Sequence, residues 1–231
     1  MTARGLLGGV RVVVFDVDDT LYLERDYVRS GFLAVEEATG FSGFAAVAWS
    51  LFNEGARHNT FDLTLESLGV PIEVASGLVS GLLKVYREHA PDIRLAVDAA
   101  EAIEACEQAG RLLAVISDGP IASQEAKIRG LGLSQRCHPV IFTEAYGEGF
   151  SKPHCRAFEA VAQASRRTAA EYVYVADNPA KDFQAPRLLG WATVRVRRVG
   201  SLHEATATPH GVDAELPDLY GLPALLGLPD T

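Results

Sequence analysis

Apolar runs and helix-like periodic segments alternate along most of the chain. The first run, Val12 to Phe15, contains no polar residue and ends directly at Asp16. Such a run is typical of a central strand in a parallel sheet whose two faces are both covered by helices. After residue 94 the pattern predicts helix 96–109, strand 112–116, helix 121–130, strand 139–143, helix 154–166, strand 172–176, helix 180–189 and strand 192–196. This alternation predicts an α/β fold with a doubly wound parallel sheet, to which the first run also belongs.

Between the first strand and residue 94 the apolar positions repeat with the period of a helix. The repeating sets are Val28/Phe32/Val35, Phe44/Val47/Leu51, Phe61/Leu65/Leu68 and Leu78/Leu82/Val85. Turn-forming residues separate these sets, which predicts a small helical insert. We therefore expect an α/β core domain formed by residues 1–21 and 94–231, and a helical domain formed by residues 22–93. The core is expected to end with a short strand and a helix within residues 212–226.

Composition places the chain among ordinary globular proteins. It has 231 residues, of which 48% are hydrophobic and 22% charged, and its formal net charge is −9. A negative net charge disfavours binding to nucleic acid and to anionic membranes, so we expect neither partner. The apolar stretch at the N-terminus is short and is interrupted by Arg11, which fits neither a signal peptide nor a membrane span. Cys106, Cys137 and Cys155 lack metal-type spacing, and we expect reduced thiols in a cytoplasmic protein.

Three carboxylates follow the first strand within four positions: Asp16, Asp18 and Asp19. Open parallel sheets place their sites beyond the carboxyl ends of the strands. Carboxylates this close repel one another unless a proton or a cation neutralises them, and Mg2+ prefers oxygen ligands. A lone Asp-x-Asp also occurs by chance in polar loops, so the remaining strand ends matter.

Polar groups follow three other apolar strands as well. They are Ser117-Asp118-Gly119, Lys152-Pro153, and Asp177-Asn178-Pro179 with Asp182. In this order, and together with the Asp16 segment, they resemble the four motifs of the haloacid dehalogenase superfamily of phosphohydrolases. The sequence departs from the family at two positions, because Ala176 stands where Gly is common and Asp118 where Asn is common.

The residues suggest how a phosphoryl group would be transferred. Asp16 is the expected nucleophile, which would form an aspartyl-phosphate, and Asp18 the expected acid and base. The resemblance implies that Mg2+ is held by the side chains of Asp16 and Asp177 and by the backbone carbonyl of Asp18. It also implies a phosphate site formed by Ser117, Asp118, Gly119 and Lys152, with Asp182 orienting Lys152 or a metal-bound water.

The helical insert resembles the small cap that covers the site in one branch of this superfamily. Its most polar loop, Arg57-His58-Asn59, either contacts the leaving group of the substrate or is a solvated turn. Tyr22 and Arg25 are further candidates for that contact.

These observations favour a Mg2+-dependent phosphatase that acts on a small phosphorylated metabolite. A 2-haloacid dehalogenase would need neither a protonated leaving oxygen nor a metal, so Asp18 and Asp177 argue against it. A phosphomutase would keep the same residues, whereas a catalytically silent metabolite-binding module would have no need to keep them together. Sugar phosphates, nucleotides and phosphoglycolate are all possible substrates, and the chain is expected to be a monomer or a homodimer.

Overall fold

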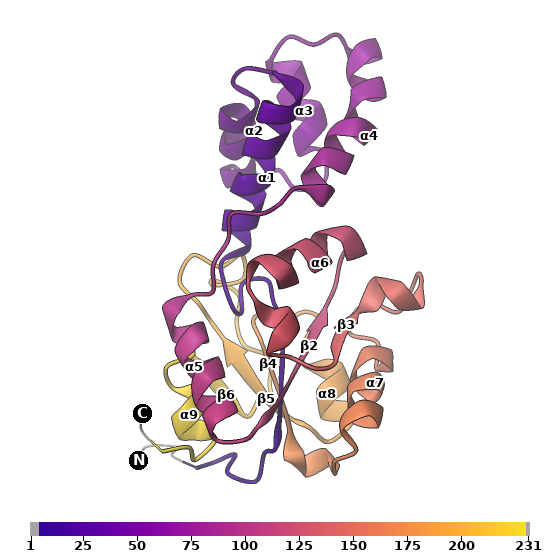
Figure 1. Cartoon of the computed structure of the whole chain (residues 1–231). Coiled ribbons are helices and arrows are strands. Elements are labelled where there is room, and N and C mark those ends of the chain that lie inside the picture. Colours follow the sequence, from indigo (N-terminus) through magenta and orange to yellow (C-terminus); the bar gives the residue numbers. More distant parts are fainter. Residues whose placement is uncertain (1–4, 230–231) are drawn as a thin grey trace.

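The structure is a computed structural model that describes residues 5–229 (Figure 1). The predicted core domain also includes residues 1–4 and 230–231, which lie outside the described residues. Figure 1 shows an α/β layer structure below and a bundle of helices above it. Within residues 5–229, no helix combines the length and the apolar character that crossing a membrane requires.

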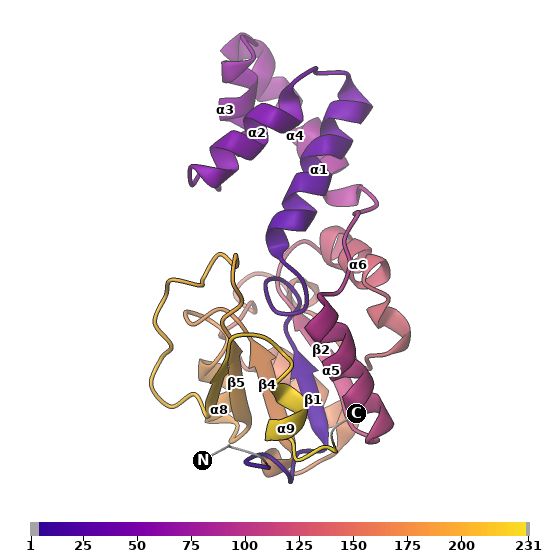
Figure 2. The same cartoon turned by 90° about the vertical axis from the view of Figure 1, so that its left-hand side faces the viewer.

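Among the described residues, the sheet has six parallel strands in the order β3-β2-β1-β4-β5-β6. The strands are β1 (Val12–Phe15), β2 (Leu112–Ser117), β3 (Val140–Phe142), β4 (Tyr172–Ala176), β5 (Ala192–Val196) and β6 (Ala214–Leu216). The predicted doubly wound sheet is therefore confirmed, with β1 at its centre between β2 and β4. Because the strands are parallel, their carboxyl ends all lie at one edge of the sheet, on the side of the helical bundle (Figure 2).

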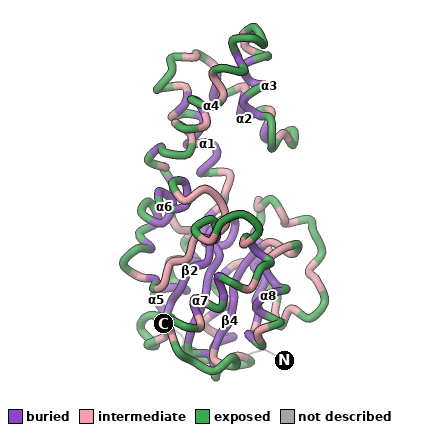
Figure 3. The backbone as a smooth tube through the Cα atoms, turned by 90° about the vertical axis from the view of Figure 1, so that its right-hand side faces the viewer, coloured by how far each residue is buried: buried purple, intermediate pink, exposed green. Residues whose placement is uncertain are grey.

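Helices cover both faces of the sheet. Val13 and Phe15 of β1 belong to one apolar cluster, whereas Val12 and Val14 belong to the cluster on the opposite face. The first cluster includes residues of α5 (Val97–Gln108), α6 (Ile121–Gly130) and α9 (Leu222–Leu225), and the second includes residues of α7 (Arg156–Ser165) and α8 (Gln184–Leu188). The apolar runs of the central strands β1 and β4 are thus fully buried, and Figure 3 shows β4 in purple.

Four helices lie between β1 and α5, and we call them the four-helix unit. They are α1 (Glu24–Thr39), α2 (Phe44–Asn53), α3 (Thr60–Ser67) and α4 (Ile72–Glu88). Their apolar faces form a separate cluster that includes Phe32, Phe44 and Leu65. Gly31 allows α1 and α4 to approach closely, since a Cβ atom there would lie 2.4 Å from the ring of Tyr86. The domain boundaries at residues 22 and 93 remain predictions.

Several predicted boundaries are wrong by a few residues. The helix predicted over 180–189 is α8, which begins only at Gln184, because the side chain of Asp182 binds the backbone of the preceding turn. There the amide of Asp182 donates to the carbonyl of Asn178 at 3.1 Å, and the amide of Asn178 donates to the carboxylate of Asp182 at 2.9 Å. The strand predicted over 139–143 is limited to β3. Three short 3-10 helices were not predicted: η1 (Leu133–Gln135), η2 (Thr143–Tyr146) and η3 (Ala169–Glu171).

Candidate active site

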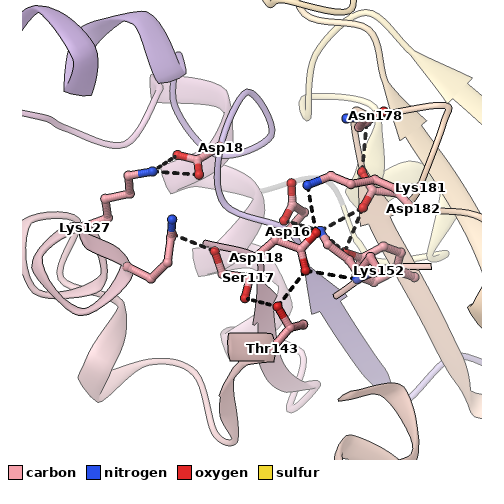
Figure 4. A network of polar contacts seen from close by, with 12 residues as sticks. Asp16, Asp18, Ser117, Asp118, Lys127, Thr143, Lys152, Asn178, Lys181 and Asp182 are labelled. Carbon is pink, nitrogen blue, oxygen red and sulfur yellow. Dashed lines mark hydrogen bonds and ion pairs between the residues drawn. The ribbon is translucent and has the colours of Figure 1, made fainter. Parts of the chain in front are cut away.

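The predicted polar groups meet at the carboxyl ends of the central strands (Figure 4). Lys152 lies at the centre of this network, and its side chain is fully buried. Its Nζ atom lies 2.6 Å from Oδ1 of Asp16 and 2.8 Å from Oδ1 of Asp182, and it donates to the hydroxyl of Tyr174 at 3.0 Å. Burial alone would lower the pKa of Lys152, but the carboxylates of Asp16 and Asp182 raise it well above its ordinary value. Lys152 is therefore an ammonium ion.

Three buried carboxyl groups lie close together beside Lys152. Asp16, Asp177 and Asp182 each offer an oxygen within 4.8 Å of the others, and all three are at most 4% exposed. Burial and the neighbouring carboxylates raise the pKa of Asp177 to about 9. Burial also raises the pKa of Asp16 to about 6, although Lys152 opposes the shift. Oxygen Oδ2 of Asp177 is buried and has no hydrogen-bond partner among the described residues.

This cluster fits a hard divalent cation. Burial and mutual repulsion disfavour ionisation of these carboxyl groups, and a cation would neutralise the carboxylates and satisfy the orphaned oxygen of Asp177. The two side chains predicted to bind metal, those of Asp16 and Asp177, both belong to this cluster. A role for the backbone carbonyl of Asp18 remains a prediction.

The carboxylate of Asp18 is bound by Lys127 of α6. Nζ of Lys127 lies 2.8 Å and 2.7 Å from the two oxygens of Asp18, and the hydroxyl of Tyr22 donates to the same carboxylate. Burial favours a higher pKa for Asp18, but the attraction and hydrogen bonds of Lys127 outweigh it and lower the pKa. The ammonium also lies 4.3 Å from the centre of the Tyr27 ring. Asp18 is thus held as a carboxylate in one orientation.

The segment after β2 contributes the remaining predicted groups. The hydroxyl of Ser117 donates to Oε1 of Gln124 at 2.7 Å. Gly119 has φ +120, and a Cβ atom at this position would lie 2.8 Å from Nε2 of Gln124, so the turn requires glycine. The carboxylate of Asp118 accepts a hydrogen bond from the hydroxyl of Thr143 at 2.8 Å and forms an ion pair with Lys181 at 2.8 Å.

A cavity of about 340 Å3 lies above these groups. The strand ends and α6 contribute one part of its lining, which includes Asp16, Asp18, Asp118, Gly119, Lys127, Asp177 and Lys181. The four-helix unit contributes Glu24, Tyr27, Leu83, Tyr86 and Arg87. Within residues 5–229, no hydrogen bond or ion pair is found for the guanidinium of Arg87. The cavity therefore combines the predicted reacting groups with a mixed aromatic and charged wall.

Arg57 and His58 do not line this cavity. They line a second cavity of about 220 Å3, which lies between the four-helix unit and Leu202 and shares Glu24, Leu83 and Tyr86 with the first cavity. The guanidinium of Arg57 donates to the carbonyls of Phe52 and Ala56, at 2.5 Å and 2.8 Å, and lies over the ring of Phe52. The predicted contact of Arg57 and His58 with a substrate remains a prediction.

Asp19 shapes the loop that follows Asp16. Its carboxylate accepts hydrogen bonds from the amides of Glu24 and Leu202, at 2.9 Å and 2.8 Å, and its φ is 53°. The loop after the first strand is thereby tied both to the start of α1 and to the segment after β5.

The sequence interpretation missed several residues of this site, notably Lys127, Lys181, Gln124, Tyr174 and Arg87. A signal for two of them exists in α6, where Ser123, Gln124 and Lys127 are all buried. These three polar residues lie on one face of α6. A buried helix face is usually apolar, so polar residues on it indicate a possible functional role.

The structure is thus a doubly wound α/β fold with a carboxylate cluster at the ends of its central strands. A sequence model of the haloacid dehalogenase-like hydrolases matches residues 10–190, and the chain belongs to this family. Two curated relatives are glyceraldehyde 3-phosphate phosphatases. The protein from Methanopyrus kandleri is 28% identical over 82% of this chain and 84% of its own length, and that from Methanocaldococcus jannaschii is 27% identical over 81% and 85%. These relatives confirm the predicted class, a phosphoric monoester hydrolase of the haloacid dehalogenase type.

Solved structures share the fold. A HAD hydrolase from Bacillus subtilis bound to magnesium superposes with a TM-score of 0.66 at 18% identity, covering 95% of this chain and 99% of its own. A 2-haloacid dehalogenase from Pseudomonas syringae gives a TM-score of 0.63 at 21% identity, covering 94% and 98%. At these identities the likeness concerns the fold alone.

Proposed function

We propose that the chain is a Mg2+-dependent phosphatase that hydrolyses a small phosphorylated metabolite through an aspartyl-phosphate intermediate. One observation carries this proposal above all: the carboxylate of Asp16 lies at the floor of the cavity, paired with Lys152 and next to the unsatisfied oxygen of Asp177. The two phosphatase relatives support the same reaction class.

In the first step, Asp16 attacks the phosphorus and the bond to the leaving oxygen breaks. Lys152 offsets the negative charge shared by the nucleophile and the phosphoryl group. The hydroxyl of Ser117 and the amide of Gly119 donate to phosphoryl oxygens, which requires the Ser117 hydroxyl to leave Gln124. Asp18 is a carboxylate without substrate, and the incoming phosphate dianion raises its pKa, so that Asp18 takes up a proton from water as the substrate binds. It then delivers this proton to the leaving oxygen.

In the second step, water attacks the phosphorus of the aspartyl-phosphate and releases phosphate. Asp18, which is then a carboxylate, accepts the proton of that water. Lys127 and Tyr22 keep the carboxylate oriented, and Asp182 keeps Lys152 beside Asp16. The nucleophile is regenerated when the bond between phosphorus and Asp16 breaks.

The carboxylates of Asp16 and Asp177 would hold the Mg2+ ion, together with the backbone carbonyl of Asp18. When bound, the ion would supply positive charge to the phosphoryl oxygens. Asp182 would act indirectly, by holding the ammonium of Lys152 in place through their ion pair.

The four-helix unit is proposed to act as a cap, with its limits near residues 22 and 93. It contributes Tyr27, Tyr86 and Arg87 to the cavity, and closure over the site would exclude water and large substrates. Glyceraldehyde 3-phosphate, the substrate named for the two relatives, is small enough to be a first candidate. A cytoplasmic location remains part of this proposal.

A phosphate-release assay tests the proposal. We expect hydrolysis of small aryl phosphates and of at least one small metabolite, loss of both activities with a chelator, and recovery with Mg2+ but poor recovery with Ca2+, whose coordination is larger and looser. Full activity after exhaustive metal removal would contradict the metal requirement. Chloride release from 2-chloropropionate without phosphatase activity would favour a dehalogenase, and transfer of the phosphoryl group within a sugar phosphate would favour a phosphomutase.

A further inference from the structure

Two ammonium groups lie near Asp16, but only one of them lines the cavity. Lys152 is fully buried beneath the carboxylates and is not among the lining residues. Lys181 lines the cavity, and its side chain is 34% exposed. A ligand in the cavity can therefore contact Lys181 directly.

The position of Lys181 is fixed from both ends. Its backbone amide donates to the carbonyl of Asn178 at 3.4 Å. The next residue of this turn, Asp182, forms the ion pair with Lys152. At the other end its ammonium lies 2.8 Å from Oδ2 of Asp118. Figure 4 shows Lys181 and Lys152 converging on Asp118 and Asp16. A lysine held at both ends loses less conformational freedom when it binds a ligand.

Asp118 is itself held rigidly. Its Oδ1 atom accepts hydrogen bonds from the hydroxyl of Thr143 at 2.8 Å and from the amide of Lys152 at 3.1 Å. Although burial favours a higher pKa, Lys152 and Lys181 lower the pKa of Asp118 below its ordinary value. Asp118 is therefore a carboxylate, a group with acceptors only.

A carboxylate facing the proposed phosphate site would repel a phosphate dianion. Lys181 removes this conflict, because its ammonium has three N–H donors and Asp118 accepts one of them. The other donors are available to the cavity. The pair thus presents N–H donors where Asp118 alone would present an acceptor.

We propose that Lys181 is a phosphate-binding residue of this site and that Asp118 is the positioning residue that holds its ammonium in the cavity. This inference rests on the proposed phosphatase function, and it names a group that the four sequence motifs do not include. The sequence predicted that Asp118 belongs to the phosphate site. In this proposal Asp118 does not contact the phosphate itself but positions Lys181, which does.

The test measures binding of inorganic phosphate to the full chain with Mg2+ present, by titration calorimetry. Lys181→Met should weaken phosphate binding by about tenfold or more, because it removes a charge-assisted contact and leaves Asp118 facing the anion. The double variant Asp118→Asn with Lys181→Met should bind phosphate more tightly than Lys181→Met alone, since the repelling charge is gone. Lys84→Met removes the same charge from the exposed side of α4 and should bind like the wild type.

A purely structural ion pair would not give this pattern. Circular dichroism and thermal unfolding would show whether each variant is folded, and Lys181→Gln provides a second polar replacement if Lys181→Met is unstable. The proposal is overturned if folded Lys181 variants bind phosphate within about threefold of the wild type, a loss too small for a charge-assisted contact. It is also overturned if the double variant binds no more tightly than Lys181→Met. Absence of phosphatase activity in the wild type would instead overturn the proposed function, and the phosphate affinities would still decide the role of Lys181.

Discussion

Asp18 and Lys127 form the most informative pair at the scale of single residues. They are 109 positions apart in the sequence, yet both oxygens of Asp18 contact the ammonium of Lys127. The side chain of Lys127 is 4% exposed, so the pair is shielded from water on the lysine side. A buried cation in this position can hold an acid and base group in one orientation, which is a requirement for efficient proton transfer.

We predict that Lys127→Met slows the hydrolysis of alkyl phosphates more than that of an aryl phosphate with a good leaving group. In the proposed mechanism alkyl leaving groups receive a proton from Asp18, whereas a stable phenolate leaves with little help. The expected loss in kcat is about tenfold or more for the alkyl substrate. Steady-state kinetics on both substrates would measure it, with Lys84→Met as a control for the lost charge. An equal loss on both substrates in a folded variant would assign Lys127 a general structural role.

The motif residues could be predicted because each follows an apolar run, and parallel strands bring their carboxyl ends to one edge. Asp16, Asp177 and Lys152 indeed meet there. The partners Lys127 and Lys181 could not be predicted in the same way. Each is a lysine in a helix or a turn, where solvent exposure is the usual outcome, and only the tertiary fold brings each one to its carboxylate.

At the scale of elements, α4 borders the central cavity. The loop after α2, which the sequence suggested as a possible substrate contact, does not line this cavity. Arg87, near the end of α4, lines the central cavity, whereas Arg57 is occupied by the carbonyls of Phe52 and Ala56. The guanidinium of Arg87, which has no partner among residues 5–229 and lines the cavity with Tyr27 and Tyr86, is suited to contact the oxygens of a leaving group.

We therefore predict that Arg87→Ala lowers kcat/KM for the preferred metabolite by about tenfold, the value of one hydrogen bond to a charged group. Hydrolysis of a small aryl phosphate should change little, because that substrate lacks polar groups for Arg87 to bind. Arg57→Ala serves as the matched comparison and should alter neither activity by much. If Arg57→Ala lowers metabolite turnover and Arg87→Ala does not, the contact predicted from the sequence for the Arg57 loop is supported instead.

Element boundaries followed the sequence closely where strands are largely buried. β4 and β5 begin and end at the predicted residues, and β2 is one residue longer than predicted. Agreement is poorer where side chains compete for the backbone, as in the turn between Asn178 and Asp182 that delays the start of α8. The four apolar sets of the insert lie on or directly beside α1 to α4, but their arrangement around one cluster depends on contacts such as Gly31 against Tyr86.

At the scale of the whole molecule, a buried ion pair connects the start of α5 to the segments around the active site. Arg198, which follows β5, contacts both oxygens of Asp98 at 2.8 Å and donates to the carbonyl of Thr20 at 2.9 Å. The amide of Leu219 donates to the same carboxylate at 2.7 Å. The network ties the loop after β1 to the C-terminal part of the chain.

We predict that Asp98→Asn lowers the free energy of unfolding by about 3 kcal/mol near neutral pH, because Arg198 is left buried without a counter-charge. Burial acts to raise the pKa of Asp98, but the hydrogen bonds of Arg198 and Leu219 lower it below its ordinary value of 3.8. A lowered pKa in the folded state stabilises the protein above the unfolded value, and this stabilisation is lost as the pH falls through the folded value.

The difference between the wild type and Asp98→Asn should therefore be constant from neutral pH down to about 5 and shrink only below about pH 4. Urea unfolding at a series of pH values would measure it. A difference that shrinks between pH 8 and 6 would indicate that a histidine or another group, rather than Asp98, controls it.

The central claim is that Asp16 carries the phosphoryl group, and chemical trapping tests it most directly. The full chain would be quenched during turnover of a phosphomonoester with Mg2+, treated with borohydride and digested for mass spectrometry. Borohydride reduces an acyl phosphate on aspartate to homoserine, so we predict homoserine at position 16, absent without substrate and absent in Asp16→Asn, whose activity should be lower by several orders of magnitude. Active turnover in which position 16 is recovered only as aspartate, or in which homoserine arises at another position, would contradict the account.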